Sequence, residues 1–216
     1  MSGPFGSSQW MYLSEDPIWY GSRGVFAGGN ASSQTDRIEY FAIATTGNTT
    51  DFGNLTQAKS KSPGGASSGV RGCFAGGRPT GGAHSLNTID YITIATTGNA
   101  SDFGDLTDTF RIHEGLSDGS RGCFGGGTRA EDTNSDVIDY ITISTIGNAL
   151  DFGNLTNATD VVGALSNSVR GVFVGGVGNV DLIQYITIAT TGNASNFGDT
   201  SHSSFFKAAG SSDDTR

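Results

Sequence analysis

The chain has 216 residues, with 34 glycines, 15% charged residues and a formal net charge of -9. Its 12 Lys and Arg residues argue against a nucleic-acid-binding surface, because phosphate binding needs clustered basic side chains. No apolar run approaches the roughly 18 to 20 residues of a transmembrane helix and the first residues lack a secretory signal, so we expect a soluble chain without membrane insertion.

Residues 1–20 form the first predicted segment, an N-terminal arm or anchor. They contain Trp10, Trp19, Phe5 and both methionines, and large apolar side chains of this kind are enriched at protein interfaces. We therefore count Trp10 and Trp19 among the candidate binding residues. The alternative interpretation is that residues 17–22 cap the first repeat, where the innermost strand of that repeat is expected.

Residues 21–216 contain a repeated motif of Arg-Gly, an apolar stretch and Gly-Gly. The four copies, 48, 50 and 49 residues apart, begin at Arg23, Arg71, Arg121 and Arg170. A period of this length with strand patterns is typical of a β-propeller, in which each repeat forms one supersecondary unit. Cys73 and Cys123 occupy a position that holds Val25 and Val172 in the other copies, so we expect small buried side chains without a disulfide.

Three further strands are predicted in each repeat. After Gly-Gly comes a loop and a strand such as Ile89-Asp-Tyr-Ile-Thr-Ile94, which is apolar on both faces and is therefore expected to be covered on both. A Thr-Gly-Asn turn and a strand beginning Asp-Phe-Gly follow, and Tyr and Phe are twelve residues apart in all four copies, which indicates a hairpin of constant length. With the segment that leads back to Arg-Gly, the pattern predicts an all-β fold, a β-propeller of four four-stranded blades.

The motifs quoted above resemble kelch repeats, whose second strand likewise ends in Gly-Gly and is followed by a spaced Tyr and a large aromatic residue. The resemblance covers residues 21–216, with Phe52, Phe103, Phe152 and Phe197 where kelch repeats usually have Trp. The amino-acid sequence of the repeats also resembles repeat arrays in virion proteins of marine bacteriophages, particularly cyanophages. These resemblances imply a kelch-like propeller and a virion component at the tail or capsid exterior.

The C-terminal segment 202–216 resembles the segment before each Arg-Gly, since Gly210 and Arg216 have the spacing of Gly65 and Arg71. In a four-bladed ring this tail would supply the missing innermost strand of the first blade. The alternative is that it pairs with a neighbouring subunit by strand addition, which would make the protein a homo-oligomer.

No catalytic, metal-binding or cofactor-binding residues are predicted. The Asp-Phe-Gly motif recurs once per repeat and is therefore interpreted as structural, with Asp51, Asp102 and Asp151 accepting turn hydrogen bonds or pairing with the repeated arginines. The three histidines have no paired spacing and are expected to be solvent-facing loop residues. We therefore expect a protein that is not an enzyme.

The loops after Gly-Gly and after the fourth strand vary between repeats, and the geometry of an up-and-down blade places both sets at one edge. Loops on a rigid scaffold commonly carry function. The candidate binding residues on this edge are Arg78, His84, Phe110, Arg111, His113, Arg129 and Glu131. The expected partners are other virion proteins or a host-surface protein or glycan. A cytoplasmic kelch-like adaptor and a lectin or carbohydrate-active enzyme are the alternatives.

Overall fold

The structure is a computed structural model. It describes residues 22–30, 34–60, 63–81, 85–111, 113–161, 163–176 and 180–202. Trp10, Trp19, His84 and nearly all of the tail 202–216 therefore lie outside the described residues, and so does the predicted arm. In the described part of the chain there is no helix with the length and apolar character needed to cross a membrane.

Sixteen strands form four antiparallel sheets of four strands each, and the described residues contain no helix. Sheet 1 comprises β1 (Arg23–Ala27), β2 (Thr35–Ala42), β3 (Thr50–Ser60) and β6 (Arg78–Pro79). Sheet 2 comprises β4 (Gly64–Ser67), β5 (Arg71–Ala75), β7 (Leu86–Thr93) and β8 (Ser101–Phe110). Sheet 3 comprises β9 (Glu114–Ser117), β10 (Arg121–Gly125), β11 (Val137–Thr142) and β12 (Leu150–Asn154). Sheet 4 comprises β13 (Gly163–Ser166), β14 (Arg170–Gly176), β15 (Val180–Thr187) and β16 (Ser195–Asp199).

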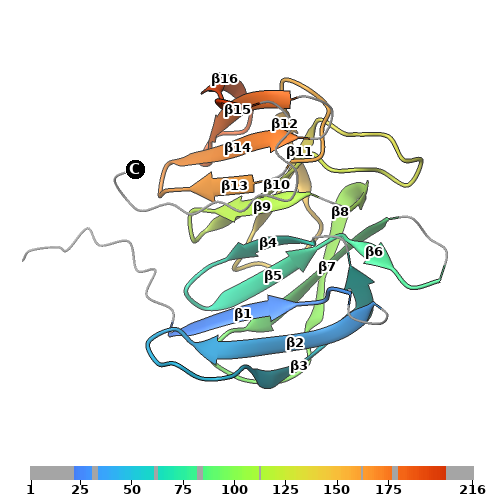
Figure 1. The fold of residues 1–216 in the computed structure, drawn as a ribbon, viewed down its shortest axis with the longest axis vertical. Coiled ribbons are helices and arrows are strands. Elements are labelled where there is room, and N and C mark those ends of the chain that lie inside the picture. Colours follow the sequence, from blue (N-terminus) through green and yellow to red (C-terminus); the bar gives the residue numbers. More distant parts are fainter. Residues whose placement is uncertain are drawn as a thin grey trace, which may run out of the picture.

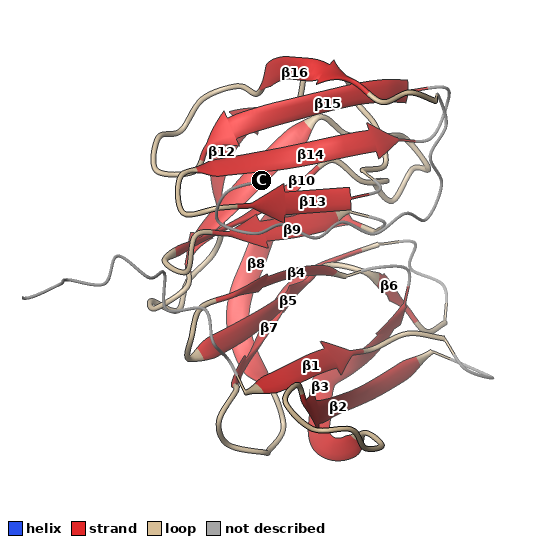
Figure 2. Cartoon of the chain, turned by 60° about the vertical axis from the view of Figure 1, so that its left-hand side comes forward, coloured by secondary structure: helices blue, strands red, loops and turns tan. Residues whose placement is uncertain are grey.

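The predicted all-β fold is confirmed, and so are the four strands per repeat in sheets 2, 3 and 4. The sheets follow one another in chain order, from the blue first sheet at the bottom of Figure 1 to the red fourth sheet at the top. In sheets 2, 3 and 4 the strands pair in sequence order, and the innermost strands β4, β9 and β13 lie next to one another (Figure 2). Sheet 1 differs, because β1 is its edge strand among the described residues and the short β6 joins its opposite edge.

The constant hairpin between the last two long strands of each repeat is explained by an aromatic contact. In sheet 2, Tyr91 pairs with Ser101, and a β-bulge between Ile89 and Asp90 shifts the register. The ring of Phe103 then meets the ring of Tyr91 edge to face, with centroids 5.9 Å apart. The equivalent pair in each other sheet has centroids 5.9 to 6.1 Å apart. The twelve-residue spacing therefore preserves one packed contact per sheet.

The core lies between the sheets. Each of the three buried clusters combines residues of two neighbouring sheets, as where Phe103 of sheet 2 joins Ile141 and Ile143 of sheet 3. Cys73 and Cys123 are free and buried in two of these clusters, as predicted. Burial raises the pKa of both thiols to about 12, so they are protonated and act as apolar side chains.

The repeated arginines connect consecutive sheets. Arg71 of sheet 2 donates a hydrogen bond of 3.0 Å to the carbonyl oxygen of Ile143 in sheet 3, and its guanidinium lies 4.9 Å from the centre of the Tyr91 ring. Arg23 and Arg121 likewise donate to a carbonyl oxygen of the following sheet and stack on a tyrosine of their own sheet. The expected pairing of these arginines with aspartates is therefore wrong. The other expectation is confirmed for Asp102 and Asp151, whose carboxylates accept turn hydrogen bonds from backbone N–H groups two residues later.

Replacing Arg121 by alanine should lower the free energy of unfolding by about 1.5 to 3 kcal/mol, because a charged hydrogen bond to the Ile188 carbonyl is lost with the stacking on Tyr140. Arg170 is a matched control: it stacks on Tyr185 at 4.3 Å, but no carbonyl of a described residue accepts from it. Arg170→Ala should cost about 0.5 to 1 kcal/mol. Urea unfolding followed by circular dichroism measures both losses, and equal losses would contradict this role for the carbonyl contact.

Candidate recognition edge

The two sets of variable loops meet at one edge of the sheets, as the alternating strand directions predict. Backbone hydrogen bonds join them: Gly29 donates to the carbonyl of Lys59, Gly77 to that of Phe110, and Gly127 to that of Thr159, at 2.8 to 2.9 Å. We call the described residues 28–30, 57–60, 78–81, 108–111, 128–136 and 157–161 the loop edge. Its residues lie toward the right-hand side of Figure 1, where β6 is labelled.

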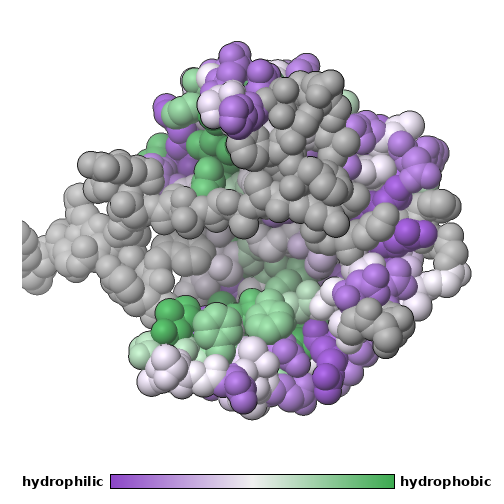
Figure 3. Space-filling view, in the orientation of Figure 1, coloured by the Kyte–Doolittle hydropathy of each residue, from purple (hydrophilic) through white to green (hydrophobic). Residues whose placement is uncertain are grey.

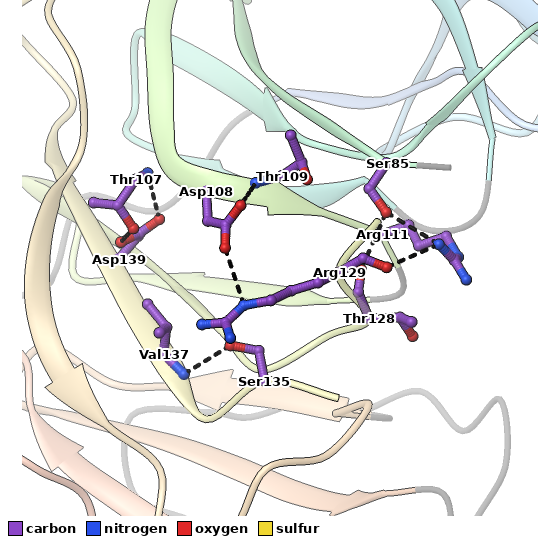
Figure 4. A network of polar contacts seen from close by, with 10 residues as sticks. All are labelled: Ser85, Thr107, Asp108, Thr109, Arg111, Thr128, Arg129, Ser135, Val137 and Asp139. Atoms are coloured by element: carbon purple, nitrogen blue, oxygen red, sulfur yellow. Dashed lines mark hydrogen bonds and ion pairs between the residues drawn. The ribbon is translucent and has the colours of Figure 1, made fainter. Parts of the chain in front are cut away.

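A network of charged side chains fastens the loop after β10 to sheet 2 (Figure 4). The guanidinium of Arg129 lies 3.0 Å from the carboxylate of Asp108, and Arg111 pairs with the carboxylate of Asp132. Arg111 also donates to the hydroxyl of Ser85 at 3.1 Å and to the carbonyl of Arg129 at 3.2 Å. These contacts give the loop a defined position on the scaffold, which a recognition surface requires.

The predicted binding residues divide into three groups. Glu131 is exposed, whereas Arg78 in β6 and Arg129 are half-buried. Phe110, Arg111 and His113 are buried, so a partner would not reach their side chains in this conformation. His84, Trp10 and Trp19 lie outside the described residues. The structure thus brings Arg111, Arg129 and Glu131 together around one loop.

The expectation that His113 faces solvent is wrong. Its side chain is 2% exposed and lies between the rings of Phe110 and Phe124, with ring centroids 6.1 and 6.2 Å away. A Cβ added to Gly76 would lie 2.5 Å from the ring, so two glycines beside it, Gly64 and Gly76, provide its space. Neither ring nitrogen has a hydrogen-bond partner among the described residues. His113 directly precedes the short strand β9, and nothing in the sequence around it indicates that its side chain is buried.

Acid should destabilise the protein through His113. Burial lowers its pKa from 6.5 to about 3, with a smaller contribution from the charge of Lys59. Because the unfolded chain binds the proton first, stability is fully present above about pH 6.5 and is lost as the pH falls toward 3, with a slope of about 1.4 kcal/mol per pH unit. His113→Phe should remove this slope in urea unfolding measured over that range. Parallel curves for the two proteins would contradict the prediction.

A polar ladder between the sheets was missed by the sequence analysis. The residue between Ile and Tyr in the strand before the Thr-Gly-Asn turn is polar in every repeat. In sheets 2, 3 and 4 the preceding sheet supplies its hydrogen-bond partner. Thr107 donates through its N–H and hydroxyl to Asp139 at 2.9 and 2.7 Å, and Thr156 does so to Gln184 at 2.6 and 2.8 Å. The sequence signal for this ladder is a polar residue in an otherwise apolar strand. Such a residue needs a hydrogen-bond partner when it is buried.

The first rung of this ladder is a buried ion pair. Asp90 of β7 accepts from the hydroxyl of Thr56, and its carboxylate lies 2.7 Å from the ammonium group of Lys59, with both charged side chains fully buried. Burial lowers the pKa of Lys59, and the charge and hydrogen bond of Asp90 oppose this shift. The ammonium group is thus held inside the molecule by one carboxylate.

A cavity of about 340 Å³ lies beside the innermost strands and offers little chemistry. Its described lining includes the backbone and small side chains of β4, β9 and β13, with Arg23 as the charged residue. The described lining residues contain no carboxylate, whereas glycoside hydrolases use a pair of them. The part of the chain that the structure describes also contains no group of three His, Cys, Asp or Glu residues able to hold a metal ion.

No protein-family model matches this chain, and no curated protein matches it.

Proposed function

We propose that this chain is a kelch-like β-propeller with a non-enzymatic recognition role, carried by the loop edge. The proposal rests on one observation: polar residues that recur in the repeats lie between the sheets, whereas charged residues found in one repeat alone include several on the loop edge. Arg71, Thr107 and Asp139, whose positions recur in the repeats, make hydrogen bonds between neighbouring sheets. Several charged residues found in one repeat alone, including Arg129 and Glu131, lie on the loop edge.

Such a division is expected of a scaffold that presents loops. The repeated residues form contacts between the sheets. The other charged residues form a surface in which ion pairs such as Arg129 with Asp108 fix the position of the loop. A protein partner or a glycan on a host surface is the expected ligand, because the edge offers exposed hydrogen-bonding and charged groups around a positioned loop. Because the repeats resemble virion proteins of cyanophages, we propose the exterior of a tail or capsid as the location of this role.

The proposed location is tested on purified virions of a phage that encodes this chain. Mass spectrometry should find its peptides in the particles, and an antibody raised against the folded chain should decorate intact virions in electron micrographs. If the peptides occur in the soluble fraction of infected cells and are missing from virions, the location is wrong and the alternative of a cellular adaptor is favoured.

The recognition role is tested with fluorescently labelled protein and whole host cells. β6 ends at Pro79 and β7 begins at Leu86, so residues 80–84 can be replaced by a Gly-Ser segment of equal length without shortening a strand. This replacement combined with Glu131→Lys should reduce cell binding at least tenfold. Thr145→Lys, an exposed change in the constant turn at the opposite edge, serves as the control. Undiminished binding of the loop variant would contradict the proposal.

A further inference from the structure

The three interfaces between consecutive sheets follow one geometric rule. The earlier sheet presents a trailing face, on which its repeated arginine and the carbonyl oxygen of its Asp-Phe-Gly phenylalanine bind the next sheet. The later sheet presents a leading face, on which its Thr-Gly-Asn turn donates to that carbonyl. Gly98 donates to Phe52, Gly147 to Phe103, and Gly192 to Phe152, at 2.7 to 2.9 Å.

The leading face of sheet 1 and the trailing face of sheet 4 do not meet in this way. In the formed interfaces, a Cβ on Gly53, Gly104 or Gly153 would lie 2.3 to 2.5 Å from a carbonyl oxygen of the next sheet, whereas a Cβ on Gly198 of sheet 4 would have nothing within 4 Å. The N–H of Gly47, in the corresponding turn of sheet 1, donates to no backbone carbonyl among the described residues, unlike the N–H groups of Gly98, Gly147 and Gly192.

Apolar side chains on both faces are correspondingly exposed. Phe197 of sheet 4 is 54% exposed, whereas Phe52, Phe103 and Phe152 at the same repeat position are at most 3% exposed. Ile43 of sheet 1 is 61% exposed, whereas its equivalents Ile143 and Ile188 are at most 1% exposed and Ile94 is half-buried. Hydrophobic residues gather on the lower part of the molecule in Figure 3, where Figure 1 places β1 and β2. Apolar exposure of this kind at matched repeat positions marks an interface.

The polar groups of the two faces also occupy the repeat positions that are paired in the three formed interfaces. Asn48 of sheet 1 is equivalent to Asn99, Asn148 and Asn193, each of which accepts a backbone hydrogen bond of 3.0 Å from the preceding sheet. Glu39 occupies the ladder position of Asp139 and Gln184, and Ser201 of sheet 4 occupies the position of Thr107 and Thr156. Arg170 stacks on Tyr185 like the three arginines that reach across an interface.

We propose that the trailing face of sheet 4 binds the leading face of sheet 1 in a second copy of this chain. A second copy is the occupant because its sheet 1 carries the complete set of complementary groups at the repeat spacing, including Ile43, Asn48 and Glu39. The contact is heterologous, so it produces a closed ring of copies or an open head-to-tail array. The inference rests on the interface geometry and is independent of the proposed recognition role.

Two variants, each disabling one face, test the proposal by light-scattering mass measurement. The wild type should have a mass of at least twice the 22.2 kDa of one chain. Ile43→Asp and Phe197→Asp should each be monomeric. An equimolar mixture of the two variants should recover a one-to-one dimer, because each retains the face that the other lacks. Ile146→Asp, at an exposed turn of sheet 3 away from both faces, should assemble like the wild type.

A monomeric wild type would overturn the proposal, because the faces would then be covered within one chain. Failure of the mixture to dimerise, with both variants folded by circular dichroism, would also overturn it. If Phe197→Asp does not fold, Gly198→Ala replaces it, because a Cβ at that position points into the space where the next sheet's turn would lie. Wild-type assembly by Gly198→Ala would equally contradict the head-to-tail geometry.

Discussion

Replacing Asp90 by alanine should lower the free energy of unfolding by about 3 to 5 kcal/mol, as expected when one partner of a buried ion pair is removed. The ammonium group of Lys59 lies 2.7 Å from this carboxylate, and both side chains are fully buried. Without Asp90, a positive charge must be desolvated without a partner or lose its proton, and either process opposes folding. Urea unfolding followed by circular dichroism measures the loss.

The chain itself offers the matched control for Asp90→Ala. Thr159 and Gln184 occupy the repeat positions of Lys59 and Asp90 between sheets 3 and 4, so the double variant Lys59→Thr, Asp90→Gln copies an uncharged version of the same interface. It should be at least 2 kcal/mol more stable than Asp90→Ala, since no charge remains to be desolvated. Equal losses for the two proteins would show that the carboxylate acts through something other than the buried ammonium group.

Gly104→Ala should lower the free energy of unfolding by about 2 to 6 kcal/mol through two separate effects. Its φ of 142° is unfavourable for alanine, which costs about 1 to 3 kcal/mol. The new Cβ would also lie 2.5 Å from the carbonyl oxygen of Gly147 in sheet 3, and the resulting overpacking costs about 1 to 3 kcal/mol more. The contact is with backbone that is hydrogen-bonded to sheet 2, so it cannot rotate away.

Gly198→Ala separates these two effects. Gly198 has a similar φ of 150°, but a Cβ there would have nothing within 4 Å. It should therefore show the conformational cost of about 1 to 3 kcal/mol alone. Thermal unfolding of the two variants should be compared at concentrations at which the wild type is monomeric, so that assembly does not contribute. A loss for Gly198→Ala that equals or exceeds the loss for Gly104→Ala would contradict the close approach of sheets 2 and 3.

The two proposals use different parts of the molecule. Recognition is assigned to the loop edge, where Arg129 and Glu131 lie, and assembly to the outer faces of sheets 1 and 4, where Ile43 and Phe197 are exposed. A head-to-tail assembly would repeat the loop edge around one side of a larger particle. Several weak contacts would then act together, because linked sites bind with an increased effective concentration.

The sequence by itself determined the local structure of this protein. The four Arg-Gly motifs, the alternation of apolar residues and the twelve-residue spacing from Tyr to Phe were enough to predict an all-β chain with four strands per repeat. These features depend on turn chemistry and on the two-residue period of a strand, both of which act over a few residues. The burial of Cys73 and Cys123 followed in the same way, because valine takes their place in other repeats.

The tertiary structure decided which residues meet across the sheets. Arg71 donates a hydrogen bond to a carbonyl oxygen 72 residues away, Asp90 forms an ion pair with Lys59, and His113 is buried among aromatic rings. A repeat pattern is the same whether its units close a ring or leave two faces open, because it specifies each sheet and not the rotation between sheets. The exposure of Ile43 and Phe197 therefore became visible only when the sheets were placed side by side.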